Sequence, residues 1–331
     1  MIYKINLMVK NANNFDNIKG LFESNIFKKC NALSVTLRDE VADVSKINYC
    51  RDLIKNNTSI FSNFKGNNFL TNATNLSLED SPEEALREVM IIYDKLKNEF
   101  IGRQYLTLAA WVIYNAKERV TYDDAIRRMR KAYEIMKKNH FFLTGSDDYV
   151  AAAMIATTSN NVEETLEEIE KCYNILKANG FWGNNNLQAL SHILSLGNGS
   201  AEEKCEKVIL LNNVLKGKRI NIRNYALPLL AVITFVTNDF EGFSNKYMMA
   251  LNELKSHSGF GTFSLNSEIR SMIVAALVCS KYLDQLKIED IDNMKIIEAT
   301  NNTALTIVTA MQAATAAACA SAAAAASASS N

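Results

Sequence analysis

Apolar side chains recur at helical spacing in a series of similar segments along this chain. Within a segment the apolar positions follow one another at intervals of three, four and three residues, which places them on one side of a helix. The columns that align between segments are Leu86, Ile126, Leu166 and Cys205, then Val89, Met129, Ile169 and Val208, then Tyr93, Tyr133, Tyr173 and, in the fourth copy, Asn212, then Leu96, Met136, Leu176 and Leu215. This pattern predicts a set of amphipathic helices, each packed along one side.

Each amphipathic segment is preceded by a helix-start motif, a capping side chain with a carboxylate three residues later. The five motifs are Ser81–Glu84, Thr121–Asp124, Asn161–Glu164, Ser200–Glu203 and Asn238–Glu241, separated by 40, 40, 39 and 38 residues. Such a pair can satisfy backbone N–H groups that every helix start leaves without a partner, and the acid favours the positive end of the helix dipole. Because five motifs recur in register, the sequence indicates a helical repeat.

A second, more apolar helix is expected after each amphipathic one. We place these helices near Arg103–Asn115, Asp147–Thr157, Leu187–Leu196, Asn224–Thr237 and Leu265–Tyr282. They are apolar almost all round, as in a buried inner layer. The predicted fold is therefore all-α, a right-handed α-solenoid of about five to six two-helix repeats of ~40 residues, a period typical of HEAT and armadillo arrays and longer than that of tetratricopeptide repeats.

Three regions follow from this pattern. Residues 1–80 are expected to form an irregular N-terminal helical cap, residues 81–283 the repeat array, and residues 284–331 C-terminal helices with an alanine- and serine-rich tail. The tail has no charged residue from Ala299 onward. We expect its Thr303–Met311 segment to be a helix that packs on the last repeat or on a second copy of the chain. A tail that touches a membrane or self-assembles is the alternative.

Composition narrows the classes of function. The 331 residues include 36 basic and 36 acidic side chains, so no net charge points to nucleic acid. The start of the chain lacks the apolar core of a signal peptide, and we expect a cytoplasmic protein. The six cysteines show no clustered spacing, and no cofactor motif is present. We therefore expect no metal site and no cofactor.

Polar side chains are densest at the predicted second helices of the second and third repeats. The candidate binding residues are Thr144, Ser146, Asp148, Tyr149, Asn184, Gln188, Ser191 and His192. In the repeat register Asp148 and Gln188 occupy the same position of neighbouring helices, and Gln188 and His192 are i, i+4 neighbours on one face. They can line a ligand or peptide site. The alternative is that these residues cap helices, shape turns and complete the packing.

The same residues allow an acid/base pair. Asp147 or Asp148 can orient the imidazole of His192, and histidine titrates near neutral pH. These three are the candidate catalytic residues. No nucleophile elbow, phosphate loop or zinc-protease motif accompanies them.

Two motifs and the alanine-rich end resemble those of DUF4003, a bacterial family of unknown function. The motifs are Phe142–Tyr149 and Gly180–Asn184 with Leu187–Leu194. The resemblance covers nearly the whole chain and implies an intracellular bacterial protein, but it brings no activity, substrate or catalytic residues. From the repeats we expect a non-catalytic scaffold that holds a protein or peptide partner in the groove of its inner helices. An enzyme is the first alternative, and a protein that acts through its tail is the second.

Overall fold

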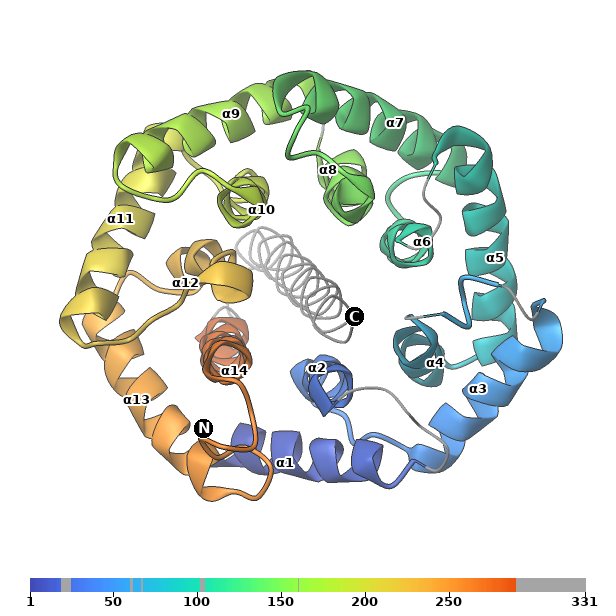
Figure 1. Cartoon of the computed structure of the whole chain (residues 1–331), viewed down its shortest axis with the longest axis horizontal. Coiled ribbons are helices and arrows are strands. Elements are labelled where there is room, and N and C mark those ends of the chain that lie inside the picture. The colour runs from blue at the N-terminus through green and yellow to red at the C-terminus, as the bar shows by residue number, and fades with distance from the viewer. Residues whose placement is uncertain (19–24, 60–61, 67, 102–104, 160, 290–331) are drawn as a thin grey trace. The chain divides into compact units, whose positions relative to one another are not determined.

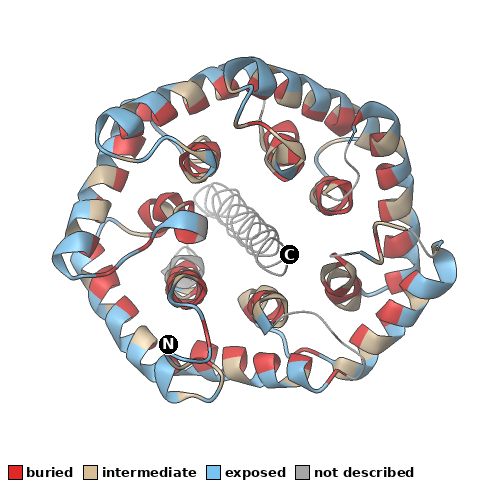
Figure 2. Ribbon diagram, in the orientation of Figure 1, coloured by how far each residue is buried: buried red, intermediate tan, exposed pale blue. Residues whose placement is uncertain are grey.

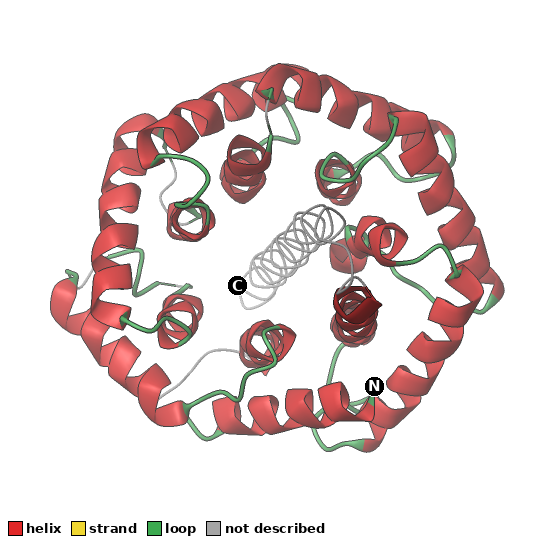
Figure 3. Ribbon diagram, turned by 180° about the vertical axis from the view of Figure 1, so that it is seen from behind, coloured by secondary structure: helices red, strands yellow, loops and turns green. Residues whose placement is uncertain are grey.

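The computed structural model describes residues 1–18, 25–59, 62–66, 68–101, 105–159 and 161–289. Within these ranges every regular element is a helix (Figure 3). The chain divides into two compact units. Of the described residues, those within Lys10–Leu166 form the N-terminal unit, and those within Met1–Val9 and from Glu167 to Glu289 form the C-terminal unit. The expectations for the alanine-rich tail and its Thr303–Met311 helix fall outside the described residues and stay predictions, as does the three-region division.

Two kinds of helix alternate along the N-terminal unit (Figure 1). Its helices are α1 (Ile2–Asp16, shared with the other unit), α2 (Asn25–Leu37), α3 (Val44–Asn57), α4 (Phe69–Ser77), α5 (Pro82–Glu99), α6 (Leu106–Asn115), α7 (Tyr122–Asn139) and α8 (Tyr149–Thr158), with a 3-10 turn, η1, at Ser146–Asp148. The amphipathic helices α3, α5 and α7 each pack on the apolar helix that follows. Each also contacts the next amphipathic helix of this unit, α3 with α5 and α5 with α7.

The C-terminal unit shows the same alternation. Its helices are α9 (Val162–Ala178, which begins in the other unit), α10 (Asn185–Leu194), α11 (Ala201–Gly217), α12 (Leu229–Val236), α13 (Phe240–Ser256) and α14 (Ser267–Glu289), with a 3-10 turn, η2, at Asn224–Ala226. Helix α11 packs on α12 and α13 packs on α14, while the apolar helices α10, α12 and α14 pack side by side. The apolar helices are buried on most faces, and the amphipathic helices expose one side (Figure 2).

Capping side chains explain why the amphipathic helices begin where they do. The helices begin at Pro82, Tyr122, Val162, Ala201 and Phe240, one residue after the predicted caps except in the last case. Thr121 accepts from the Asp124 N–H at 3.3 Å, and Asn161 accepts from the Glu163 and Glu164 N–H groups at 3.1 and 3.4 Å. Ser200 forms the complete capping box, in which its own N–H donates to Glu203 at 2.9 Å and its hydroxyl accepts from the Glu203 N–H at 3.2 Å.

Two of the five predicted caps were wrong in detail. Ser81 stands at the start of α5 but makes no side-chain capping hydrogen bond. At the fifth start the cap is Asp239 and not Asn238, since the Asp239 carboxylate accepts from the Gly242 N–H at 2.9 Å. The glycine makes this approach possible, because a Cβ at position 242 would lie 2.0 Å from the Asp239 carboxylate.

Ser200→Ala should lower the free energy of unfolding by about 1 kcal/mol, because the Glu203 N–H in the first turn of α11 loses the hydroxyl that accepts its hydrogen bond. Ser81→Ala is the matched control, since Ser81 occupies the same position without a side-chain capping bond. Urea titrations of both variants measure the difference. Equal losses for the two substitutions would show that the capping box at Ser200 adds nothing.

Candidate functional site

The predicted site residues fall into two groups that belong to different units. Thr144, Ser146, Asp147, Asp148 and Tyr149 lie in the N-terminal unit, and Asn184, Gln188, Ser191 and His192 lie in the C-terminal unit. Each group is therefore described by itself. The proposed acid/base pair joins an aspartate of one unit to His192 of the other, and it stays a prediction.

The first group builds the turn between α7 and α8. The Thr144 hydroxyl donates to the Met136 carbonyl at 3.1 Å and ties the turn to the last residues of α7. Asp148 closes the turn from the other side, because its carboxylate accepts from the Gly145 N–H at 2.9 Å. Both contacts hold the backbone in place before α8 begins, which is the role that capping side chains have at helix starts.

Tyr149 connects this turn to the preceding one. Its ring is buried, with centroids 5.0 Å from Phe100 and 4.8 Å from Tyr133, and its hydroxyl donates to the Ile101 carbonyl. Burial, with a further contribution from Tyr133, raises the pKa of Tyr149 to about 12. The hydroxyl therefore stays protonated and keeps its hydrogen bond at neutral pH. We call Phe100, Tyr133 and Tyr149 the aromatic cluster.

Asp148 has an unusual protonation equilibrium for a carboxylate. Burial, with a smaller contribution from the neighbouring Asp147 charge, raises its pKa to about 7, although the hydrogen bond from the Gly145 N–H opposes the shift. The group is half-buried, whereas Asp147 beside it is exposed. Its charge therefore changes close to neutral pH, where an unperturbed aspartate is fully ionised.

Stability should depend on pH through Asp148. Its folded pKa lies above that of the unfolded chain, so between about pH 4 and about pH 7 the native state binds more protons, and stability falls as pH rises through that window. Asp148→Asn should remove this part of the pH dependence of stability, an effect on the order of 1–3 kcal/mol in the free energy of unfolding across the window. Urea titrations across the window measure it.

Asp147→Asn is the control, because Asp147 is exposed and adjacent in sequence. Asp147→Asn should retain the pH dependence of stability seen in the wild type. An unchanged slope in Asp148→Asn would show that this carboxyl is solvated and ordinary.

The second group lies on and before α10. Asn184 caps the helix, since its side chain accepts from the Asn186 and Leu187 N–H groups at 3.0 and 3.1 Å. The Ser191 hydroxyl donates to the Leu187 carbonyl at 3.0 Å within the same helix. Gln188 is 1% exposed and His192 is 4% exposed. The free chain thus covers the side chains that were expected to line a groove.

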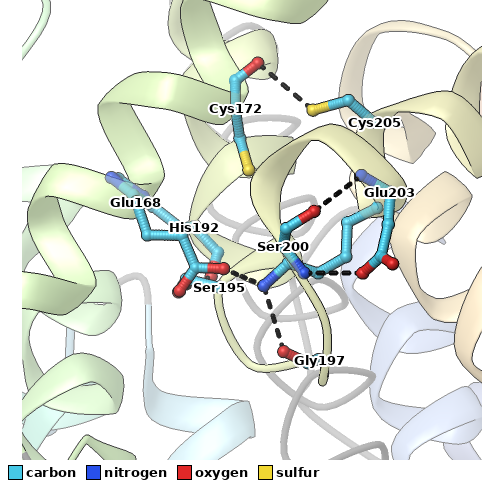
Figure 4. A network of polar contacts seen from close by, with 9 residues as sticks. Glu168, Cys172, His192, Ser195, Gly197, Ser200, Glu203 and Cys205 are labelled. Atoms are coloured by element: carbon cyan, nitrogen blue, oxygen red, sulfur yellow. Dashed lines mark hydrogen bonds and ion pairs between the residues drawn. The ribbon is translucent and has the colours of Figure 1, made fainter.

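A buried ion pair next to this helix was not predicted from the sequence. The Lys204 ammonium in the first turn of α11 donates to the Gly197 carbonyl at 3.1 Å and pairs with the Glu168 carboxylate of α9 (Figure 4). The Lys204 side chain is 5% exposed, while that of Glu168 is 30% exposed. Burial of Lys204 could have been predicted from the sequence, because Lys204 occupies the repeat position that holds the buried Ala85 and Ala125.

A second missed feature is the exposure of large apolar side chains in turns. The four most exposed of these in the described residues are Ile101 (93%), Phe142 (96%), Trp182 (82%) and Phe263 (104%). All four lie in turns that lead from an amphipathic helix to the next apolar helix. Phe141 in the same turn as Phe142 is 63% exposed. We call these five the turn apolar residues; three belong to the N-terminal unit and two to the C-terminal unit.

Two features are absent from the described part of the chain. No group of three or more His, Cys, Asp or Glu side chains there is arranged to hold a metal ion. None of the helices described has the length and apolar character needed to cross a membrane.

Comparison with known proteins places the chain in a family. Residues 14–314 match the family described as "Protein of unknown function (DUF4003)". The chain belongs to this family. It is also 26% identical over 242 residues to the "Uncharacterized protein YeaA" of Bacillus subtilis (strain 168), a match that covers 70% of each chain. No solved structure matches significantly. The resemblance predicted from the two polar motifs is thus confirmed, and the family brings no activity with it.

Proposed function

We propose that this DUF4003 protein is a non-catalytic helical-repeat scaffold that binds a protein or peptide partner through its turn apolar residues. In this proposal the chain is a right-handed α-solenoid of ~40-residue, two-helix repeats. The observation that supports it is that the most exposed apolar side chains recur at one point of the repeat, the turn after each of several amphipathic helices.

Exposure of this kind is unfavourable for a free protein and favourable for an interface. Phe142 and Trp182 each leave most of a large aromatic surface in water, although aromatic side chains dominate the binding energy of protein interfaces. Singly exposed apolar residues are common, but the turns after α5, α7, α9 and α13 each carry a large apolar side chain that is more than four-fifths exposed. The recurrence therefore favours a contact surface for another chain.

Contacts to buried side chains hold two of these positions in the N-terminal unit. The Tyr149 hydroxyl donates to the Ile101 carbonyl, and the Thr144–Met136 hydrogen bond holds the turn that carries Phe141 and Phe142. Preformed turns lose little conformational entropy on binding, which increases affinity. Lys137, whose ammonium lies 5.8 Å from the centroid of the Phe141 ring, supplies a polar rim beside the apolar contact.

The groove of the inner helices is the alternative surface. Gln188, Ser191 and His192 would contact a partner there, but all three are buried in the free chain. A partner would have to displace what covers them. The turn apolar residues need no such rearrangement, and we therefore assign the contact to them.

Site-specific photo-crosslinking in the source cell tests this surface. A photoreactive amino acid at position 142 should join the protein to one discrete partner. The matched control places it at Met249, which is 72% exposed on α13 and lies outside the turns. A product at position 249 but not at position 142, or a product only at position 188 or 192, would contradict the assignment.

An enzyme is the second candidate, and one observation favours it. A carboxyl with a pKa of about 7, such as Asp148, can exchange protons at neutral pH as a general acid or base. His192 would then be its partner. Metabolite profiles of cells that carry wild-type, Asp148→Asn or His192→Ala chains test this candidate. Both variants should accumulate the same compound, and profiles identical to wild type would exclude catalysis by these residues.

A further inference from the structure

Two cysteines from consecutive amphipathic helices meet in the core of the C-terminal unit (Figure 4). Cys172 lies on α9 and Cys205 in the first turns of α11, and both side chains are fully buried. The Cys205 thiol donates toward the Cys172 carbonyl oxygen at 3.6 Å. Both are free thiols in this structure. A disulfide needs two cysteines on adjoining segments, and the contact of the Cys205 thiol with the Cys172 backbone places these two side by side.

We propose that Cys172 and Cys205 are a redox site, at which a small peroxide converts the two thiols into an intramolecular disulfide. The bond would link α9 to α11 across 33 residues of sequence. The inference does not depend on the proposed partner surface, because neither cysteine lies in a turn that carries a turn apolar residue.

The pKa values of the two thiols are shifted in opposite directions. The contact with Cys205 lowers the pKa of Cys172, and the Lys204 ammonium lowers it further, whereas burial opposes the shift. Interaction with Cys172, together with burial, raises the pKa of Cys205. The thiolate is the nucleophilic form of cysteine, and a nearby lysine favours it. We take Cys172 as the attacking thiol and Cys205 as the thiol that resolves the intermediate; the same disulfide forms if the order is reversed.

The chemistry balances with hydrogen peroxide as the oxidant. The Cys172 thiolate attacks one peroxide oxygen, the O–O bond breaks, and the departing hydroxide takes a proton to become water, which leaves a sulfenic acid on Cys172. The Cys205 sulfur then attacks the Cys172 sulfur, the S–O bond breaks, and a second water leaves. Two thiols and one peroxide give one disulfide and two waters. Because both thiols are fully buried, a small oxidant reaches them on local opening more readily than a bulky one.

The test is peroxide treatment of the folded chain, followed by unfolding, alkylation of the remaining thiols and peptide mass spectrometry. The wild type should lose two of its six thiols and give a peptide that joins Cys172 to Cys205, and dithiothreitol should reverse both changes. Its thermal melting temperature should rise on oxidation, because the cross-link restrains the unfolded chain.

Three variants complete the design. Cys172→Ser and Cys205→Ser should give neither the cross-linked peptide nor the rise in melting temperature. Cys279→Ser is the matched control, since Cys279 is a fully buried thiol of α14 in the same unit, and it should behave as wild type. Melts of the reduced variants establish first that each is folded. Sulfinic acid at Cys172 without a cross-link, a different pairing, or unchanged thiols in the folded wild type would overturn the proposal.

Discussion

Glu168→Ala should lower the free energy of unfolding by about 2–4 kcal/mol, one of the two largest effects expected for a single substitution in this protein. The reason lies in Lys204, whose ammonium is buried and would lose its anionic partner. Breaking a buried pair leaves an uncompensated charge, which costs more than the pair contributes. The partial exposure of Glu168 places the effect below that of a fully buried pair. Urea unfolding at neutral pH measures it.

The control removes the charge instead of its partner. Lys204→Met fills the same space without an ammonium, and the double variant Glu168→Ala/Lys204→Met should be more stable than Glu168→Ala alone. Ion pairs between exposed side chains give a further comparison. Lys55 and Asp52 form such a pair on α3, and Asp52→Ala should change stability by less than about 1 kcal/mol. Equal effects for Glu168→Ala and Asp52→Ala would mean that Lys204 is solvated.

Tyr149→Ala should destabilise the chain by about 3–5 kcal/mol, the range for deletion of a fully buried aromatic side chain. The substitution removes the ring that contacts Phe100 and Tyr133 and the hydroxyl that holds the Ile101 carbonyl. The turn that carries Ile101 should therefore loosen as well as the core. Hydrogen exchange of the backbone around residues 100 and 101 should accelerate together with the loss in stability.

Tyr149→Phe separates the two contributions. It keeps the ring and removes only the hydroxyl, so a loss of about 0.5–1.5 kcal/mol is expected, with faster exchange confined to the turn. If Tyr149→Phe were as damaging as Tyr149→Ala, the hydrogen bond and not the aromatic cluster would hold this turn. If neither substitution changed stability, Tyr149 would be free to act as a binding residue, as its position in the sequence motif suggested.

Helix positions could be predicted from the sequence because their signals are local. Capping side chains and the three–four–three apolar spacing lie within one helix, and α7 and α11 begin at the expected residues. The helix-start motif did not locate the N-terminal helices, and the reason is also local. Helix α3 is capped by Asp43, whose carboxylate accepts from the Ser45 and Lys46 N–H groups, but a lysine stands where the motif requires a carboxylate. The cap is present and the motif is not.

The candidate site was less predictable because its contacts join distant residues. Tyr149 was identified as polar and candidate-binding, but its hydroxyl is used by Ile101, 48 residues earlier in the chain. The burial that raises the pKa of Asp148 likewise could not be predicted from the residues of its own helix start. A repeat register identifies equivalent positions in successive helices, but it does not show which side chains a later segment covers. Exposure of Phe142 and Trp182 could only be seen in the folded chain.

The affinity of the crosslinked partner for two variants tests the central claim most directly. Phe142→Ser should weaken binding by at least about tenfold, the loss typical of an interfacial aromatic anchor, while the melting temperature stays that of wild type because the side chain is 96% exposed. Met249→Ser, on the exposed side of α13, should change neither quantity. Unchanged affinity in Phe142→Ser, with binding lost in Gln188→Ala or His192→Ala at unchanged stability, would contradict the account and assign the partner to the inner helices.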